Sequence, residues 1–355
     1  MNSSEREKEM KKQNARPDID WAKIPFGYIK TDYNVRCTFT NGEWGPIEIS
    51  DSEVINIHMA ATALHYGQEI FEGQKAFRGI DGKIRIFRPE ENADRIRRSA
   101  NGLMMTPVPK ERFVEMMEQV VRLNERFVPP YESGSSFYLR PLEIGISARV
   151  GVHPSEDYLF VIFGTPVGAY FPDGVKPTKV VVYREYDRAA PCGTGRWKVG
   201  GNYAGGMVGT MRAKREGFSA VLFLDPKEKK YIDECGPANF FAIKGNKYIT
   251  PKSNSILPSV TNMSLQQLAR DMGMEVECRP ILLEELSEMD EAAECGTAAV
   301  ASPISEVYDN DNDVHYVIAR DGKPGPVTMA LYEKLRAIQY GKDPDIYGWM
   351  HEVKL

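Results

Sequence analysis

A single lysine stands between two glycine-rich turns in the stretch Gly193-Thr-Gly-Arg-Trp-Lys198-Val-Gly-Gly-Asn-Tyr203. Glycine loses more conformational freedom on folding than any other residue, so a cluster of glycines indicates backbone that must approach another group closely. A desolvated lysine amine in such a place can form a Schiff base with an aldehyde. Most lysines lie on the surface, however, and the pattern is also compatible with an ordinary exposed loop. Other residues of the chain are needed to distinguish a Schiff-base lysine from a lysine in an exposed loop.

Length and composition describe a globular chain that is large enough for two domains. Of its 355 residues, 42% are hydrophobic and 27% are charged, which is ample for a buried core. The net charge is -5, and basic and acidic residues are intermixed, which argues against a nucleic-acid partner or an anionic membrane surface. No apolar run reaches the roughly 18 residues that a membrane span requires.

The cysteines are widely spaced and form no Cys-x-x-Cys pair. This pattern predicts neither a disulfide framework nor a zinc site, and it fits a reducing cytoplasm. The five histidines are scattered and do not predict a metal centre either. The chain is therefore expected to be cytoplasmic and to hold no metal ion.

Strand and helix patterns alternate along the chain and predict a mixed α/β (α+β) fold in two domains. The first 16 residues are polar and lack the apolar core of a secretory signal, which predicts a disordered leader over 1–16. Turn formers in Phe171-Pro-Asp-Gly174-Val-Lys-Pro177 predict an interdomain linker over 171–178, between a small N-terminal α/β domain (17–170) and a large C-terminal domain (179–355). Strands are expected at 70–77, 83–87, 136–141, 158–164, 178–183, 219–225, 238–244 and 296–302, and helices at 90–103, 112–127, 204–216, 261–272, 282–291 and 328–338.

A series of short motifs carries a resemblance to a known family. The motifs are Leu64-His65-Tyr66-Gly67, Ile70-Phe71-Glu72-Gly73-Gln-Lys-Ala-Phe77, Phe87-Arg88-Pro89, Asn92-Ala-Asp94-Arg95, Val167-Gly-Ala-Tyr170-Phe-Pro, the lysine stretch itself, Ile256-Leu-Pro258, Gly296-Thr297-Ala298 and Ile338-Gln-Tyr-Gly341. In this order they resemble branched-chain amino-acid aminotransferases, the long-chain group of fold-type-IV pyridoxal-phosphate enzymes. Each motif alone is weak, but the ordered set covers nearly the whole chain. The resemblance implies the two-domain fold-type-IV aminotransferase fold, with the cofactor between the domains and anchored by the C-terminal one.

The resemblance also implies a pyridoxal 5'-phosphate cofactor and a role for the residues around its ring. Lys198 is the Schiff-base lysine, and it shuttles the proton at the substrate α-carbon as a neutral amine. Glu234, in Asp233-Glu234-Cys-Gly-Pro237, faces the pyridine nitrogen, although an acidic pair before Cys-Gly-Pro by itself favours a solvated turn. Tyr203 faces the phenolic oxygen.

The phosphate of that cofactor needs a cation and backbone donors. By resemblance, Arg95 is the phosphate arginine, and the backbone amides of Val260 and Thr261 with the Thr297 hydroxyl complete the cradle. The helix expected over 261–272 supports this assignment, because a helix start offers free N–H groups and a positive dipole end. Thr261 is also compatible with a simple helix cap.

For the substrates, the resemblance implies branched-chain amino acids, glutamate and their 2-oxo acids, in a homodimer. An aromatic wall would bind the aliphatic side chain by burial, worth roughly 1.5–3 kcal/mol for leucine, isoleucine or valine. Arg140 orders that wall, and the amides of Thr297 and Ala298 hold the substrate carboxylate. The wall residues are Phe26, Phe71, Tyr138 and Tyr170, joined by Tyr66 and Val152 from the partner subunit.

Two departures from the family pattern stand out. Mammalian relatives carry a Cys-x-x-Cys pair just after Gly-Thr-Ala, but the residues from Thr297 to Pro303 include no cysteine, so no thiol switch is expected there. Many relatives have a threonine three residues after the glutamate, where this chain has Pro237. A hydroxyl that could contact Tyr203 is therefore lost, whereas the anchoring residues are all present.

Other functions remain open from the sequence. A fold-type-IV lyase resembling aminodeoxychorismate lyase would share the lysine and the glutamate but lack the aromatic-rich N-terminal lobe. A D-amino-acid transaminase would be shorter and would match the residues from Leu64 to Phe77 less well. A non-catalytic ligand-binding protein could use the loop from Gly200 to Gly206, and it would show no visible absorbance.

Overall fold

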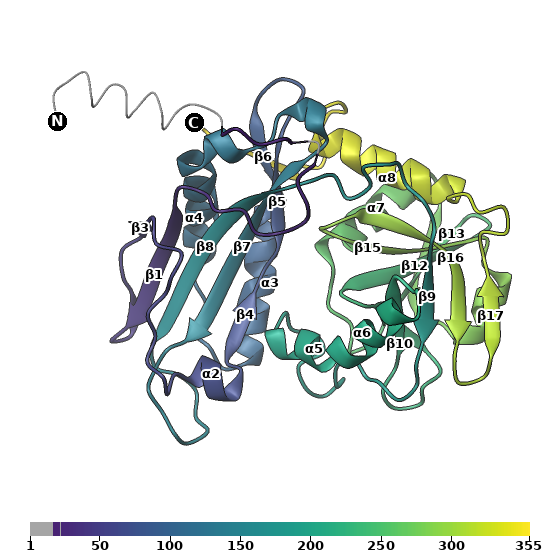
Figure 1. Cartoon of the computed structure of the whole chain (residues 1–355), viewed down its shortest axis with the longest axis horizontal. Helices are drawn as coiled ribbons and strands as arrows, with labels where there is room; N and C mark the ends of the chain where they lie inside the picture. Colours follow the sequence, from purple (N-terminus) through teal and green to yellow (C-terminus); the bar gives the residue numbers. More distant parts are fainter. Residues whose placement is uncertain (1–16, 22) are drawn as a thin grey trace.

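The computed structural model describes residues 17–21 and 23–355, so the leader predicted over 1–16 lies outside the described residues. The chain forms two lobes, each built around a nine-stranded sheet. Figure 1 shows the first lobe in purple and blue beside the second lobe in green and yellow, with helices packed against both sheets. This arrangement confirms the predicted fold class of mixed α and β in two domains.

The strands of the first lobe are β1 (Asn34–Thr40), β2 (Glu43–Trp44), β3 (Glu48–Ser50), β4 (Glu69–Phe71), β5 (Gln74–Arg78), β6 (Ile84–Phe87), β7 (Ser136–Gly145), β8 (Tyr158–Val167) and β18 (Met350–Glu352). They follow the path β18-β6-β5-β7-β8-β1-β2, with β3 beside β1 and β4 beside β7. The central pair of β7 and β8 is antiparallel along its whole length, from Ser136 opposite Val167 to Gly145 opposite Tyr158. Because β18 pairs with β6, the end of the chain returns to the first lobe (Figure 1).

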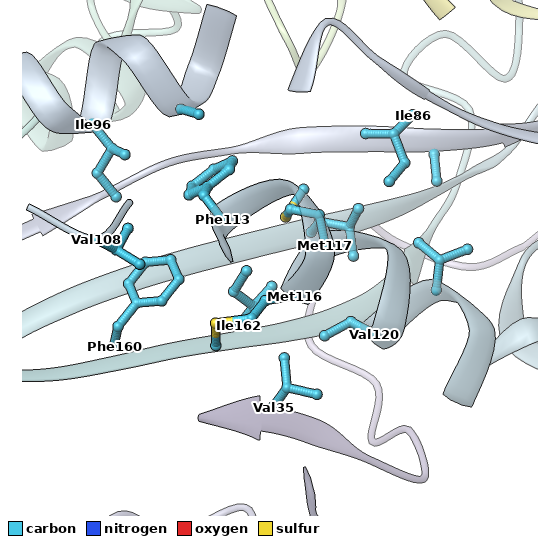
Figure 2. Close-up of a cluster of buried hydrophobic side chains, with 14 of the residues drawn as sticks. Val35, Ile86, Ile96, Val108, Phe113, Met116, Met117, Val120, Phe160 and Ile162 are labelled. Atoms are coloured by element: carbon cyan, nitrogen blue, oxygen red, sulfur yellow. The ribbon is translucent and has the colours of Figure 1, made fainter. Parts of the chain in front are cut away.

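Two helices, α3 (Pro89–Gly102) and α4 (Lys110–Leu123), supply the core of this lobe. Pro89 stands at the start of α3, where its missing N–H costs nothing. Helix α4 is amphipathic, as its 3.6-residue periodicity predicts, and Figure 2 shows its apolar side chains near Phe160 and Ile162 of β8. The buried residues of α4 are Phe113, Met116, Met117, Val120 and Val121.

Glu143 of β7 is a carboxyl group buried in this lobe, and it predicts a pH-dependent stability. Burial raises its pKa to about 8. A carboxyl pKa that is higher in the folded than in the unfolded state stabilises the protein below pH 4.5, and this contribution is lost as the pH rises toward 8. Glu143→Gln, which stays neutral, is expected to flatten the decline of the unfolding free energy between pH 5 and 8 by about 4 kcal/mol.

Denaturant unfolding of the wild type and of Glu143→Gln at several pH values measures this effect. Glu132→Gln is the matched control, because Glu132 is exposed. Parallel pH profiles for the wild type and Glu143→Gln would contradict the prediction.

The second lobe contains β9 (Thr178–Val182), β10 (Ala220–Leu224), β11 (Ile232–Cys235), β12 (Ala238–Lys244), β13 (Lys247–Pro251), β14 (Glu275–Arg279), β15 (Glu291–Gly296), β16 (Val300–Asp309) and β17 (Val314–Val317). Their path is β11-β10-β9-β16-β15-β12-β13-β14, and β11 also pairs with β12. This extra pairing closes the path from β11 to β12 into a barrel. Its interior is apolar and includes Val180, Leu222, Phe240 and Ile304.

Four helices accompany this barrel: α5 (Gly200–Gly205), α6 (Met207–Arg215), α7 (Val260–Asp271) and α8 (Pro326–Gln339). Helices α7 and α8 share one apolar cluster with Phe241 and Ala293 of the barrel strands. The single helix predicted over 204–216 is instead the pair α5 and α6, which meet at Gly206. Among the described residues, none of the helices combines the length and the apolar character that crossing a membrane requires.

The strand expected over 70–77 is divided into two strands, β4 and β5. Two further expected elements were wrong. The helix expected over 282–291 is a short 3-10 helix, η3 (Leu283–Glu288), after which β15 begins at Glu291. Leu283, Leu286 and Met289 are buried at intervals of three, a spacing that suits a 3-10 turn better than an α-helix. The strand expected over 296–302 is a hairpin, because residues 297–299 form the turn between β15 and β16.

The predicted domain limits stay a prediction. Residues 168–177 carry no helix or strand, and β9 begins at Thr178, next to the predicted linker over 171–178. The last strand, β18, belongs to the first sheet although its residues fall within the predicted C-terminal domain. The two lobes are thus connected by the chain twice.

Candidate active site

A cavity of about 900 Å³ lies between the two lobes. Residues of β4, β7 and β8 line it from the first lobe, and α5, α6, the β11–β12 turn and the β15–β16 turn line it from the second. The predicted site residues that line it are Phe26, Phe71, Tyr138, Arg140, Tyr170, Lys198, Tyr203, Thr297 and Ala298.

Lys198 lies in the loop just before α5 and lines the cavity. Its Nζ donates a hydrogen bond to Tyr203 Oη over 2.7 Å and lies 4.6 Å from the centre of the Phe71 ring. Residues of the first lobe hydrogen-bond both the amide and the carbonyl of Lys198. The Lys198 amide donates to Ser99 Oγ over 3.0 Å, and its carbonyl accepts from the Phe71 amide over 3.1 Å. Lys198 is therefore a partly buried residue at the junction of the lobes, not a residue of an exposed loop.

Glu234 is a buried acid on β11, with only 2% of its surface exposed. Burial raises the pKa of its carboxyl to about 7, and the guanidinium of Arg188, with Nη2 3.6 Å from Oε1, opposes the rise. The Leu257 amide donates to the same oxygen. Arg188 also donates to the carbonyls of Gly195, over 2.7 Å, and Ser255. These contacts connect Glu234 to the loop that carries Lys198. Because Glu234 is buried, they exclude the alternative interpretation that it lies in a solvated turn.

Arg95 of α3 is held rigidly by a buried glutamate. Its Nε and Nη2 donate to the two carboxylate oxygens of Glu72 over 2.7 and 2.6 Å. Its Nη1 donates to the Pro258 carbonyl over 3.0 Å. Because Pro258 directly precedes Ser259, the N-cap of α7, the guanidinium lies near that helix terminus.

The first turn of α7 presents its backbone to the same region. Ser259, not Thr261, is the cap, and its Oγ accepts from the Asn262 amide over 3.2 Å. Val260 and Thr261 occupy the first helical positions, where amides have no partner within the helix and the dipole is positive. Both residues line a small pocket together with Thr297. The structure thus brings three of the four predicted phosphate residues into one small pocket, and Arg95 contacts the segment that leads into this helix through the Pro258 carbonyl.

The β15–β16 turn, residues 297–299, is held from the first lobe. Lys75 Nζ donates to the Ala298 carbonyl over 2.7 Å, and Thr297 Oγ1 donates to the Gly73 carbonyl over 3.2 Å. Lys75 is 6% exposed, and burial, with a smaller effect of Arg336, lowers its pKa to about 7. Val300 closes the turn with φ 69°, a strained conformation for a β-branched residue. The backbone of the turn is therefore fixed in place.

The aromatic residues form a wall on one side of the cavity. The rings of Phe26 and Tyr138 meet edge to face with centroids 5.3 Å apart. Arg140 Nη2 donates to Tyr138 Oη over 3.1 Å, and its guanidinium lies 5.0 Å from the centre of the Phe71 ring. A Cβ at Gly73 would collide with the Tyr138 hydroxyl, so glycine is required beneath the wall.

Tyr66 and Val152 do not line the cavity of their own chain. Tyr66 ends α2 (Thr62–Tyr66), and its hydroxyl donates to the Val150 carbonyl. Tyr66 is 39% exposed and Val152 is 86% exposed. Met59 and Leu64 are exposed in the same segment as Tyr66. We call these residues, with Val150, the α2 patch.

Sequence reasoning missed three residues that support the site. Glu72 and Lys75 stand within the quoted motif Ile70–Phe77, but nothing in the sequence shows that Glu72 pairs with Arg95 or that Lys75 reaches Ala298. A fully buried glutamate and a buried lysine are visible only once the strands are folded. Arg188, which contacts Glu234, lies in a loop without a recognisable motif.

Comparison with known proteins agrees with this geometry. The family of class IV amino-transferases matches residues 69–307. A branched-chain-amino-acid aminotransferase of Haemophilus influenzae is 42% identical over 344 residues, 95% of this chain and 99% of that protein. One of Helicobacter pylori is 41% identical over 95% of this chain and 98% of its own length. A solved structure of the T.th. branched-chain amino acid aminotransferase with pyridoxamine 5'-phosphate is 28% identical, with a TM-score of 0.77 over 92% of this chain and 100% of that one.

These similarities extend over nearly the full length of this chain and of its relatives. The chain belongs to the branched-chain-amino-acid aminotransferases of the class IV amino-transferase family.

Proposed function

We propose that this protein catalyses reversible amino transfer between L-leucine, L-isoleucine or L-valine and 2-oxoglutarate, with pyridoxal 5'-phosphate as cofactor. The observation that carries the proposal is the contact of Lys198 Nζ with Tyr203 Oη, 2.7 Å apart in the cavity between the lobes. The relatives named as branched-chain-amino-acid aminotransferases support the choice of substrates. The related structure with pyridoxamine 5'-phosphate supports the cofactor.

The residues present fit this cofactor. Hydrogen bonds within the described residues use Nε, both protons of Nη2 and one proton of Nη1 in Arg95, which leaves one guanidinium proton for an anion. The phosphate would bind there and to the amides of Val260 and Thr261, with the Thr297 hydroxyl beside them. Glu234 would pair with the ring nitrogen, because a buried carboxylate favours a cationic partner.

When bound, the cofactor draws away the electron pair that is left at the substrate α-carbon. The protein supplies the proton transfer: Lys198 Nζ removes the proton from the α-carbon of the amino acid and returns one to the α-carbon of the 2-oxo acid. Tyr203 Oη orients Nζ through their hydrogen bond. The proximity of the Phe71 ring limits the access of water to the amine.

Substrate binding uses the two faces of the cavity differently. The amides of Thr297 and Ala298 would hold the α-carboxylate, on the turn that Lys75 fixes. The wall of Phe26, Phe71, Tyr138 and Tyr170 would cover an aliphatic side chain. Arg140, which lines the same cavity, would assist the second carboxylate of glutamate.

The α2 patch supports a homodimer in which Tyr66 and Val152 complete the neighbouring site. Leu64→Asp places a charge in this patch, and it is expected to give a monomer without transaminase activity. The wild type should sediment at twice the 40.0 kDa mass of the chain. Ile346→Asp, at an apolar residue that is 77% exposed elsewhere, is the control and should stay dimeric and active. An active monomer would contradict the shared site.

Arg95→Ala is expected to have two effects: it should weaken cofactor binding, and it should lower the stability of the folded protein. The buried Glu72 carboxylate would lose its partner, which typically costs about 3–5 kcal/mol. The double variant Arg95→Met with Glu72→Gln removes both charges, so it should recover most of the stability but not the cofactor affinity. Denaturant unfolding and equilibrium dialysis measure the two effects. Wild-type cofactor affinity in the double variant would show that Arg95 does not bind the phosphate.

The visible spectrum of the purified protein tests the proposed function directly. A yellow absorbance that moves to the near ultraviolet with L-leucine, and returns with 2-oxoglutarate, is expected. A yellow protein that does not respond to L-leucine would indicate a lyase or another amino donor. A protein that stays colourless with added pyridoxal 5'-phosphate would contradict the proposal.

A further inference from the structure

The mouth of the barrel opens into the active-site cavity and contains a carboxyl group that the proposed mechanism does not use. Glu294 of β15 lines the cavity, and 9% of its surface is exposed. It stands opposite Ser302 of β16, and it lies within hydrogen-bonding reach of the Ser302 hydroxyl and the Cys235 thiol of β11. Among the described residues, no lysine, arginine or histidine forms an ion pair with it. Glu294 is thus a buried acid without a basic partner, on the cavity wall.

The other titratable groups around Glu294 do not compensate its charge. Cys235 and Cys295 are both buried, and burial holds their thiol pKa values well above the ordinary value, so both stay neutral at neutral pH. Burial also raises the pKa of Tyr170, and the nearby Glu294 adds to that rise. Burial raises the pKa of Glu294 itself, because its charged form has lost water without gaining a cation.

We propose that Glu294 is a specificity-determining residue, which favours substrates with an aliphatic side chain over substrates with a second carboxylate. The inference rests on the proposed function. Tyr170 and Glu294 line the same cavity, and Tyr170 belongs to the wall proposed to cover the substrate side chain. A neutral Glu294 is compatible with both kinds of side chain. An ionised Glu294 repels a second carboxylate, and the burial of Glu294 strengthens this repulsion.

The discrimination should therefore increase with pH. At low pH, Glu294 is protonated, and the enzyme can alternate between an aliphatic amino acid and glutamate. At high pH, the dicarboxylate loses affinity relative to the aliphatic acid. Arg140 lines the same cavity and is present in the wild type and in every Glu294 variant, so it does not affect their comparison. Lys75 and Glu234 also change charge near pH 7. They act on the substrate α-carboxylate and on the cofactor, which are common to both kinds of substrate, so their effect cancels in the ratio of the two affinities.

Binding of two non-reacting acids to the cofactor-loaded enzyme tests this inference. Glutarate carries the second carboxylate, and 4-methylpentanoate carries the aliphatic group. Isothermal titration calorimetry from pH 6 to pH 9 gives the ratio of their dissociation constants. For the wild type, we expect the ratio of glutarate to 4-methylpentanoate to rise about tenfold, which corresponds to about 1.4 kcal/mol of repulsion. In Glu294→Gln the ratio should be independent of pH.

Two further variants make the outcome specific. Glu69→Gln changes the other carboxyl group that lines the cavity, and it should keep the pH-dependent ratio. Glu294→Ala is a second neutral variant in case the amide disturbs the contacts with Ser302 and Cys235. A flat ratio in the wild type, or a pH-dependent ratio that survives in both Glu294 variants, would overturn the inference and leave the proposed function intact. Failure of both acids to bind the wild type would contradict the proposed function as well.

Discussion

Lys198→Ala is expected to lower the rate of amino transfer by about 10⁴-fold or more, because it removes both the amine that holds the cofactor and the group that moves the α-proton. The variant should still fold, since the backbone of Lys198 makes the contacts with the first lobe and these contacts remain in the variant. It should also retain part of its cofactor, because the Arg95 and α7 region is untouched. Single-turnover kinetics with L-leucine measure the loss.

A matched control exists in the same cavity. Lys214 of α6 also lines the cavity but is exposed, and Lys214→Ala is expected to keep nearly full activity. A small primary amine added to Lys198→Ala should restore part of the rate, since it can replace the missing proton acceptor. Turnover of Lys198→Ala within tenfold of the wild type would remove Lys198 from the proposed mechanism.

Glu234→Ala is expected to lower the rate by about 10²–10³-fold, which is the usual cost of removing one electrostatic contact that favours the transition state. The reason is the loss of the negative charge that would keep the cofactor ring nitrogen protonated. Glu234→Gln removes the negative charge but keeps the size of the side chain, and its amide oxygen can still accept from the Leu257 amide. We expect the two variants to lose similar amounts of activity, with better stability for glutamine.

The neighbouring acid provides the comparison. Asp233 is also 2% exposed, but it accepts from Ser253 Oγ over 2.7 Å and from Ser255 Oγ. Asp233→Asn should therefore change stability more than rate. Near-normal kcat in Glu234→Gln would show that the charge of Glu234 is not needed for catalysis.

Local sequence patterns predicted the amphipathic elements, in which one face is buried in a hydrophobic core. Helix α4 follows from the spacing of Phe113, Met116 and Val120, and the start of α3 follows from Pro89. Several short barrel strands were not expected, among them β11 and β15, because four to six residues that are almost all buried show no alternation. The 3-10 helix η3 was mistaken for an α-helix because leucine and glutamate favour both.

In the candidate site, too, contacts between residues close in sequence could be predicted, whereas contacts between distant residues could not be predicted from local patterns. Lys198 and Tyr203 are close in sequence, so one glycine-rich loop and the first turn of α5 bring them together. Glu234, Arg95 and Thr297 come from distant strands and helices, and only the family resemblance placed them together before the fold was known. The buried partners Glu72, Arg188 and Lys75 depend on strand register and on contacts between lobes, which no local pattern in the sequence encodes.

The pairing of β18 with β6 has a consequence for how the protein is made. Strand β6 forms the edge of the first sheet until Met350–Glu352 arrive, and these residues are translated after every other strand that the structure describes. A nascent chain thus presents an unpaired strand edge, a template for aggregation, until β18 is translated. A change in β18 would therefore act on the lobe whose other strands are translated first.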